Sequence, residues 1–239
     1  MSDTARRLRA FSVHVLTASG IAFDLLAVRE LLAPEPDVRR VFLLLLVPVL
    51  IDSVDGPLAR RWDVKEWAAV VDGRTIDDIV DYLTFTFVPL LLVWRMEWLP
   101  EPAGAFVVVA LVASLLGFAH REAKQDELGF FRGFPSYWNV YAFYAGLWAP
   151  RYGPALNAAV LLALAALTVA PVRFLYPNRA PRRWRPAVIG GVLAWTVLLL
   201  AMLRSYPNVS SALLWTSLAY PAFYVALSLA LDARARRAT

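Results

Sequence analysis

The chain has 239 residues, of which 59% are hydrophobic and 18% are charged, and its formal net charge is +5. Apolar segments recur along its whole length, which excludes a soluble domain with one buried core helix, because roughly 20 consecutive apolar residues span a bilayer as a helix. The chain contains no cysteine, so disulfide bonds and thiolate metal sites are excluded as well.

The apolar segments predict an all-α fold, a polytopic membrane helical bundle of about eight transmembrane helices. The polar interruptions between them are short, so we expect one integral membrane domain over residues 1–239. No internal repeat is evident. The segments, of which the fifth is the shortest, are 11–33, 38–59, 75–95, 103–120, 134–149, 154–175, 186–204 and 209–231.

Three arginines, Arg6, Arg7 and Arg9, precede the first apolar segment. Signal peptides begin in the same way, but this segment is long enough to cross a membrane and shows no good cleavage pattern, so we expect an uncleaved helix. If the N-terminus is cytoplasmic, most of the 24 Lys and Arg residues fall on the cytoplasmic side. The charge pattern therefore predicts two cytoplasmic termini and a basic rim suited to anionic lipid headgroups. Because topology explains the basic residues, nucleic acid is not an expected partner.

The hairpin between the second and third segments carries four aspartates on its cytoplasmic side. Asp52 and Asp55 lie three residues apart near the end of one helix, and Asp77 and Asp81 lie four apart near the start of the next. Each spacing places a pair on one helical face, so the four carboxylates can converge. Read singly, Asp55 could belong to a turn, and Asp77 could merely favour a helix N-terminus. The combination is more specific than either reading.

Clustered negative charge beside a bilayer is costly unless it is compensated. Carboxylate oxygens are the ligands that Mg²⁺ and Mn²⁺ prefer. The aspartates therefore predict a site for Mn²⁺ or Mg²⁺, with two ions able to act on the attacking and leaving oxygens of one phosphoryl centre. The neighbouring residues agree, since Gly56 lets a ligand approach the backbone and Arg60 can meet phosphate oxygens.

The pattern Asp52-x2-Asp55-Gly56-x2-Ala59-Arg60, followed by Gly73-x3-Asp77-x3-Asp81, resembles the signature of the CDP-alcohol phosphotransferases. These membrane enzymes have a helical bundle and a divalent-metal site, and they displace CMP from a CDP-alcohol with a second alcohol. The loop 61–72 is longer than is usual, and it is similar to the bacterial phosphatidylcholine synthase branch, which joins choline to CDP-diacylglycerol. The resemblance covers residues 11–150, and Ser53 stands where this branch is expected to have glycine. The other segments that carry it are 13–20, 85–89, 131–135 and 138–139.

The resemblance implies a role for each residue of the signature. It implies that Asp52, Asp55 and Asp77 hold the metals and that Asp81 is both a metal ligand and the general base. A choline hydroxyl has a high pKa and needs such help to attack phosphorus. We expect direct displacement, since the chain has no cysteine and no Ser–His pair is evident from the sequence. CDP and phosphate binding is assigned to Gly56, Ala59, Arg60 and Gly73.

The resemblance also implies a setting, which is a bacterial inner-membrane enzyme with a cytoplasmic active site, surrounded by membrane lipids. It further implies a homodimer. Near the end of the first helix, Thr17 and Ser19 could hydrogen-bond the cytidine, or their hydroxyls could satisfy the helix backbone. His14 is better read as a buried, hydrogen-bonded histidine than as a catalyst, because the carboxylates already supply the chemistry.

A stretch rich in aromatic residues predicts a choline pocket. Choline carries a quaternary ammonium, which proteins recognise with aromatic faces. In the segment 130–144, Trp138 and Tyr141 share a face if the segment is helical. Tyr82 and Phe85 follow the predicted base closely, and these four residues are the expected choline contacts. Aromatic residues are also enriched at membrane interfaces, which is the competing explanation.

Other functions remain open at this stage. Glu122 or Asp126 could attract choline, whereas Arg121, Lys124 and Arg132 keep serine open as an acceptor. Inositol phosphate and glycerol phosphate are further alternatives. A transporter would place its acidic residues near mid-bilayer in two related halves, and here they gather at one membrane face. A membrane scaffold without turnover would not need the complete set of four aspartates.

Overall fold

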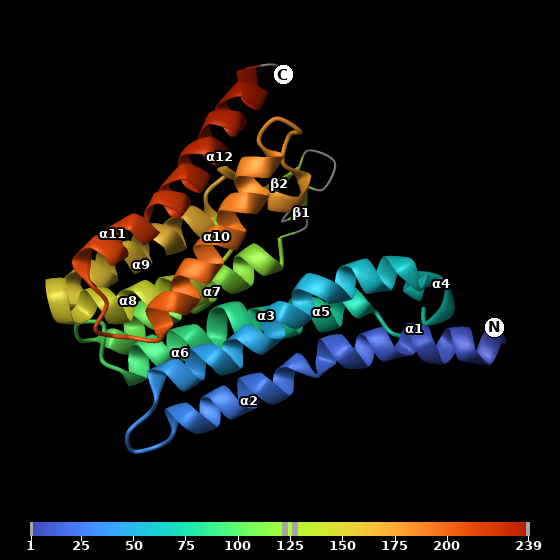
Figure 1. The fold of residues 1–239 in the computed structure, drawn as a ribbon, viewed down its shortest axis with the longest axis horizontal. Helices are drawn as coiled ribbons and strands as arrows, with labels where there is room; N and C mark the ends of the chain where they lie inside the picture. Colours follow the sequence, from blue (N-terminus) through green and yellow to red (C-terminus); the bar gives the residue numbers. More distant parts are fainter. Residues whose placement is uncertain (1, 121–123, 126–128, 238–239) are drawn as a thin grey trace. The chain divides into compact units, whose positions relative to one another are not determined.

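The computed structural model describes residues 2–120, 124–125 and 129–237. The chain divides into two compact units, Met1–Arg95 and Met96–Thr239. Almost all of the regular structure is helical, as the apolar segments predict (Figure 1). Each unit is described by itself below.

The first unit contains the helices α1 (Asp3–Ala18), α2 (Gly20–Leu31), α3 (Val38–Arg61), α4 (Val64–Trp67), α5 (Gly73–Asp81) and α6 (Val88–Arg95), with a π-helical turn η1 (Tyr82–Phe87) between the last two. Asp37 caps α3 by accepting hydrogen bonds from the backbone N–H groups of Arg39 and Arg40. Asp72 caps α5 through the N–H group of Arg74 at 3.1 Å. These caps fix where the two helices of the aspartate hairpin begin.

The first apolar segment forms two helices that meet at Ser19 (Figure 1). The glycine that follows the break allows close packing. A Cβ atom on Gly20 would lie 2.9 Å from Val80 Cγ1 and 3.1 Å from Pro48 Cβ, so only glycine lets α2 approach both α3 and α5 this closely. The break and the glycine together set α2 against the two helices that carry the aspartates.

The second unit contains α7 (Ala103–Phe118), α8 (Trp138–Tyr152), α9 (Pro154–Val169), a 3₁₀ turn η2 (Pro177–Arg179), α10 (Arg185–Leu203), α11 (Ser211–Ser217) and α12 (Ala219–Arg237). Three short antiparallel strands, β1 (Lys124–Gln125), β2 (Phe130–Arg132) and β3 (Arg173–Leu175), form a sheet in the order β1-β2-β3. The sequence did not predict this sheet. Phe130 pairs with Leu175, and Arg132 pairs with Arg173.

A glycine after β2 holds the sheet against α9. Gly133 has a φ of +77°, and a Cβ atom there would lie 2.1 Å from the carbonyl oxygen of Thr168. Its backbone N–H group donates to Val172 O at 2.7 Å, and that of Phe134 donates to Leu167 O at 3.0 Å. Glycine is required here for both its conformation and its size.

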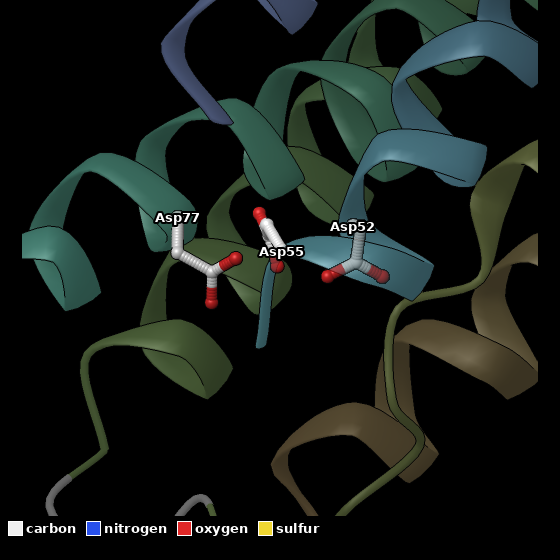
Figure 2. A group of neighbouring side chains, drawn as sticks. All are labelled: Asp52, Asp55 and Asp77. Atoms are coloured by element: carbon white, nitrogen blue, oxygen red, sulfur yellow. The ribbon is translucent and has the colours of Figure 1, made fainter. Parts of the chain in front are cut away.

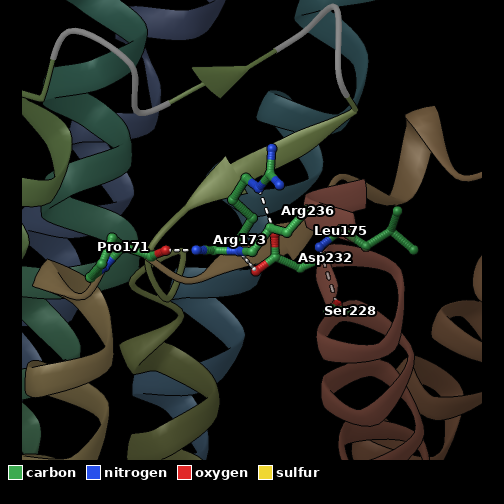
Figure 3. Close-up of polar contacts among 6 residues, drawn as sticks. All are labelled: Pro171, Arg173, Leu175, Ser228, Asp232 and Arg236. Atoms are coloured by element: carbon green, nitrogen blue, oxygen red, sulfur yellow. Dashed lines mark hydrogen bonds and ion pairs between the residues drawn. The ribbon is translucent and has the colours of Figure 1, made fainter. Parts of the chain in front are cut away.

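A polar stripe on α12 satisfies the free edge of β3 (Figure 3). The hydroxyl of Tyr224 donates to the carbonyl oxygen of Leu175 at 2.7 Å. The N–H group of Leu175 donates to the hydroxyl of Ser228 at 3.1 Å. One turn further, Asp232 accepts hydrogen bonds from Arg173 at 2.5 Å and from Arg236 at 2.9 Å. The stripe thus satisfies both backbone groups of Leu175, which an open edge strand would otherwise expose.

The helices agree with the expected all-α membrane bundle, and the count of about eight spans stays a prediction. In the described part of the chain, four helical stretches are long and apolar enough to cross a membrane: Asp3–Leu31, Val38–Arg61, Arg185–Leu203 and Ser211–Arg236. Ala103–Phe118 and Pro154–Val169 are shorter apolar helices. The expected segment 154–175 ends as a helix at Val169 because Pro171 disfavours helical backbone in the residue before it. The expected segment 134–149 becomes helical only from Trp138.

Candidate metal centre and active site

Three of the predicted aspartates gather in the first unit. Asp52 and Asp55 project from α3 and Asp77 projects from α5, and one oxygen atom of each lies within 4.8 Å of the others. Figure 2 shows Asp55 between the other two carboxyl groups. Oxygen ligands stand about 2.0–2.6 Å from Mg²⁺ or Ca²⁺, so ligands of one ion lie at most about 4–5 Å apart. The three residues therefore fit a divalent cation.

The middle carboxyl group is buried and held in place. Asp55 has 7% exposure, and its Oδ2 accepts a hydrogen bond from Thr17 Oγ1 at 2.7 Å. Thr17 Oγ1 also lies 3.2 Å from Val13 O, but its single hydrogen favours the shorter contact. This bond fixes the orientation of the Asp55 carboxyl group, and both of its oxygens keep lone pairs for a ligand. Burial of a carboxylate with one hydroxyl donor favours a cation beside it.

Asp81 occupies the last position of α5, one turn after Asp77, and its side chain is partly buried. It lies outside the group of three whose oxygens all approach within 4.8 Å. The prediction that Asp81 is a metal ligand and the base stays a prediction. The structure places it on the helix that carries Asp77, directly before the π-helical turn.

The two signature glycines differ in their surroundings. A Cβ atom on Gly56 would meet only Arg60 Nη1, at 3.6 Å, which is an ordinary contact. A Cβ atom on Gly73 would lie 2.6 Å from Cε1 and 2.8 Å from Nδ1 of His14. His14 is buried, and its Nε2 lies 3.4 Å from Ala68 O. Gly73 is therefore needed for helix packing, whereas Gly56 keeps space beside the aspartates open.

The loop that precedes α5 is anchored on α1. Ala10 and Val13 of α1 form a buried cluster with Val64 of α4 and with Ala68, which follows α4. Ala59 is among the partly buried residues packed against this cluster. The guanidinium of Arg6 lies 5.1 Å from the Trp67 ring, and that of Arg9 lies 5.3 Å from the Trp62 ring. An open pocket of about 420 Å³ lies between them, lined by Arg7, Leu8, Phe11 and residues 66–70.

The capping aspartate of α5 is ionised at neutral pH. The hydroxyl of Thr75 donates to Asp72 Oδ2 at 2.8 Å and, with the N–H group of Arg74, holds the pKa of Asp72 below its ordinary value.

Arg60, assigned to phosphate binding, is exposed on the last turns of α3. Ser19 donates its hydroxyl to Leu16 O at 2.6 Å, which is the backbone role that the sequence left open for it.

The four predicted choline contacts fall in both units. Tyr82 and Phe85 lie in η1 of the first unit and are partly buried. Trp138 and Tyr141 lie on α8 of the second unit, where their rings meet edge to face with centroids 5.6 Å apart. This confirms that the two share a helical face. Glu122 and Asp126 lie outside the described residues.

The two aromatic residues of α8 are deeply buried in their unit. Trp138 has 0% exposure, and its Nε1 donates to Ser114 Oγ at 2.7 Å. Tyr141 has 3% exposure, and its hydroxyl donates to Asn157 O at 2.9 Å. These contacts give both residues a packing role inside the second unit. Their contact with choline stays a prediction.

Sequence reasoning missed a second buried carboxyl group in the first unit. Asp24 on α2 has 3% exposure, and both of its oxygens accept from Thr84 Oγ1, at 3.1 and 3.0 Å. The signal was present, because an aspartate inside an apolar segment marks a functional position in membrane proteins. The partner, 60 residues away, could not be read from the sequence.

A helical membrane domain with an aspartate cluster of this spacing defines the class of CDP-alcohol phosphotransferases. The chain is similar to proteins named phosphatidylcholine synthase. That of Pseudomonas aeruginosa is 35% identical over 95% of this chain and 94% of its own length. That of Bradyrhizobium diazoefficiens is 40% identical over 89% and 81%, and that of Rhizobium meliloti is 36% identical over 80% and 77%. The chain therefore belongs to the phosphatidylcholine synthase family. It matches no family model, and no solved structure matches it.

Proposed function

We propose that the chain transfers the phosphatidyl group of CDP-diacylglycerol to choline, releasing CMP, at the cytoplasmic face of a bacterial inner membrane. The choline oxygen forms a bond to the phosphorus that bears diacylglycerol. The bond from that phosphorus to the oxygen of CMP breaks, and the hydroxyl proton passes to a base. The observation that carries the proposal is the gathering of Asp52, Asp55 and Asp77 between two helices.

The metal-binding residues of the proposal are Asp52, Asp55 and Asp77, joined by Asp81. Mn²⁺ or Mg²⁺ bound there would offset the charge of the phosphates and polarise the attacking and leaving oxygens. The residues of the chain do the rest. Thr17 orients the buried carboxyl group of Asp55 through its 2.7 Å hydrogen bond. The lone pairs of the Thr17 hydroxyl remain able to accept a hydrogen bond from cytidine.

The substrate-binding residues follow the signature. Arg60 binds phosphate oxygens, because a guanidinium matches their geometry. Gly56 leaves space for the nucleotide next to α3, since a Cβ atom there would meet no protein atom closer than 3.6 Å. Asp81 accepts the choline proton. An aspartate beside cations is a weak base, so a cation held by the aspartates would supply part of the activation of the hydroxyl.

The choline-binding residues of the proposal are Tyr82 and Phe85, together with Trp138 and Tyr141. Tyr82 directly follows Asp81, so an ammonium group held against its ring would keep the choline hydroxyl near the base. Each aromatic face contributes about 0.5–2 kcal/mol to binding a cation. We further propose a homodimer, which light scattering of the purified protein in detergent would test.

An acceptor screen tests the proposal. Purified protein receives CDP-diacylglycerol and Mn²⁺, and CMP release is compared with choline, serine, inositol phosphate, glycerol 3-phosphate and no acceptor. Asp81→Asn serves as the variant that retains size but lacks the base. We expect CMP release with choline alone, and its loss in the variant. Release with a different alcohol would keep the metal chemistry and overturn choline as the acceptor.

A further inference from the structure

A buried carboxyl–hydroxyl pair joins the first membrane helix to the turn that follows Asp81. Asp24 lies on α2 with 3% exposure, and Thr84 lies in η1 with 1% exposure. Thr84 Oγ1 donates to the carboxyl group of Asp24, with its oxygens at 3.0 and 3.1 Å. A carboxyl group in the apolar interior of a membrane helix is costly, so it is retained where it has a function.

The hydroxyl of Thr84 would have a partner without Asp24. A threonine in a helix usually donates to the backbone carbonyl three or four residues earlier. Several threonines of this chain do so, including Thr168 to Leu164 O at 2.9 Å and Thr196 to Val192 O at 2.8 Å. Thr84 instead donates its hydroxyl hydrogen to Asp24, which lies 60 positions away in the sequence. The bond therefore links two elements and does not serve the helix itself.

The turn that Thr84 belongs to is a π-helix. The N–H group of Val88 donates to Leu83 O, five residues earlier. Such turns are rare, add one residue to the helix, and occur often at functional sites. One added residue corresponds to about 100° of rotation in an α-helix. The π-helical turn thus sets how the face with Asp77 and Asp81 is oriented relative to α6, whose Leu90, Leu92 and Val93 are buried.

The other end of the pair is fixed to the metal-binding helix. Gly20 brings α2 into close contact with Pro48 of α3, the helix that carries Asp52 and Asp55. Asp24 lies one turn after Gly20 on α2. A continuous path therefore runs from the aspartates of α3 through Gly20 and Asp24 to Thr84, three residues after Asp81.

We propose that Asp24 and Thr84 are positioning residues, which hold the π-helical turn so that Asp81 faces the aspartates of α3. They act through the turn and touch no substrate. The inference rests on the proposed function only for the role of Asp81. The bond fixes the position of the turn along α2 and sets the rotation of α5, which packing of apolar side chains alone would leave less closely defined.

The test compares four variants of the full chain in detergent. Thr84→Val removes the hydroxyl and keeps the shape of the side chain, Thr84→Ser keeps the hydroxyl, and Asp24→Leu removes the acceptor. Thr86→Val is the matched control, because Thr86 lies in the same turn with 0% exposure and its hydroxyl has no hydrogen-bond partner among the described residues. Two quantities are measured: kcat for choline-dependent CMP release, and hydrogen exchange at the amide of Val88, which reports the π-helical bond.

We expect Thr84→Val and Asp24→Leu to lower kcat about 10-fold or more, with the KM values for both substrates nearly unchanged. The amide of Val88 should exchange faster in both. Thr84→Ser should restore both quantities, and Thr86→Val should leave both at wild-type values. An unchanged kcat in Thr84→Val would overturn the inference. So would a lower kcat with unchanged exchange at Val88, or a loss that Thr84→Ser does not restore.

Failure of the proposed function would look different. If the wild-type chain released no CMP with choline, the acceptor would be wrong, yet exchange at Val88 would still be measurable. Unchanged exchange in Thr84→Val would then overturn the inference by itself. Faster exchange there, restored by Thr84→Ser and absent in Thr86→Val, would support the link between α2 and the turn.

Discussion

Thr17 on α1 donates its hydroxyl hydrogen to Oδ2 of Asp55 on α3 at 2.7 Å, and the two residues lie 38 positions apart in the sequence. The bond is buried, since Thr17 has 8% and Asp55 has 7% exposure. It holds the carboxyl group of Asp55 in one orientation within the group of three aspartates. Residues that orient metal ligands in this way are often worth about 10–100-fold in metal affinity.

We therefore predict that Thr17→Val weakens Mn²⁺ binding about 10-fold or more, because valine keeps the shape of the side chain but cannot donate to Asp55. Thr17→Ser should bind Mn²⁺ nearly as the wild type does. Electron paramagnetic resonance of free Mn²⁺ during titration measures this without turnover. Equal Mn²⁺ affinity in the valine variant would show that the bond does not orient the carboxyl group for a metal.

Metal removal should lower stability as well as activity. A ligand present at 100 times its Kd stabilises the folded protein by about 2.7 kcal/mol. EDTA should therefore abolish CMP release and lower the unfolding temperature, and Mn²⁺ should restore both. Asp55→Asn should remove the stabilisation by Mn²⁺. Asp78→Asn is the matched control, because Asp78 lies next to Asp77 but pairs with Arg74 at 3.6 Å. Loss of the Mn²⁺ effect in that control would place the ion elsewhere.

The two signature glycines should respond differently to alanine. Gly56 lies inside α3, and the added Cβ would have only an ordinary contact with Arg60. Alanine in a helix interior is favoured over glycine by about 1 kcal/mol, so Gly56→Ala should fold at least as stably as the wild type. Its activity should fall sharply, because the methyl group occupies the space proposed for the nucleotide. A thermal melt beside an assay of KM for CDP-diacylglycerol checks this. Full activity would remove Gly56 from the binding site.

Gly73→Ala should instead destabilise the first unit, because its Cβ would lie 2.6 Å from the His14 ring. Overpacking of this kind costs about 1–3 kcal/mol. His14→Ala makes room, so the double variant should be more stable than the sum of the two single changes predicts. Thermal unfolding of the four proteins gives this coupling. Additive changes would mean that the histidine ring moves away at no cost.

The helices and the gathering of the aspartates could be predicted because their signals are local. Apolar segments of sufficient length locate membrane helices, and spacings of three and four residues place Asp52 with Asp55 on one helical face. Strands of two or three residues carry no such signal, so the sheet that contains Phe130 and Leu175 could not be predicted. The function of Gly133 is visible only in its contact with Thr168, 35 positions along the chain.

Partners distant in sequence were the other limit. From the sequence, the hydroxyl of Thr17 could be expected to hydrogen-bond the cytidine or the helix backbone. In the structure it donates to Asp55 at 2.7 Å. Asp24 could have been noticed, because it interrupts an apolar segment. Its link to Thr84 depends on the π-helical turn Tyr82–Phe87, and the sequence does not indicate this turn because a single π-helical turn has no periodicity of its own.

The KM for choline distinguishes aromatic residues that contact choline from those that only pack. Loss of one aromatic face costs about 0.5–2 kcal/mol of cation binding, which is roughly a 2- to 30-fold rise in KM. We predict such a rise for Tyr82→Leu, with little change in KM for CDP-diacylglycerol and in the unfolding temperature, because Tyr82 is only partly buried. A KM for choline equal to that of the wild type would remove Tyr82 from the pocket.

The same measurement decides whether the buried aromatic residues of α8 contribute more than packing. Tyr141→Phe keeps the ring and loses only the hydrogen bond to Asn157 O, which should cost about 1 kcal/mol of stability. Tyr141→Leu also removes the face. If Tyr141 contacts choline, KM should rise in the leucine variant alone, while kcat and the unfolding temperature separate this from a packing defect. Equal KM values in both variants would leave Tyr141 with the structural role that its 3% exposure already indicates.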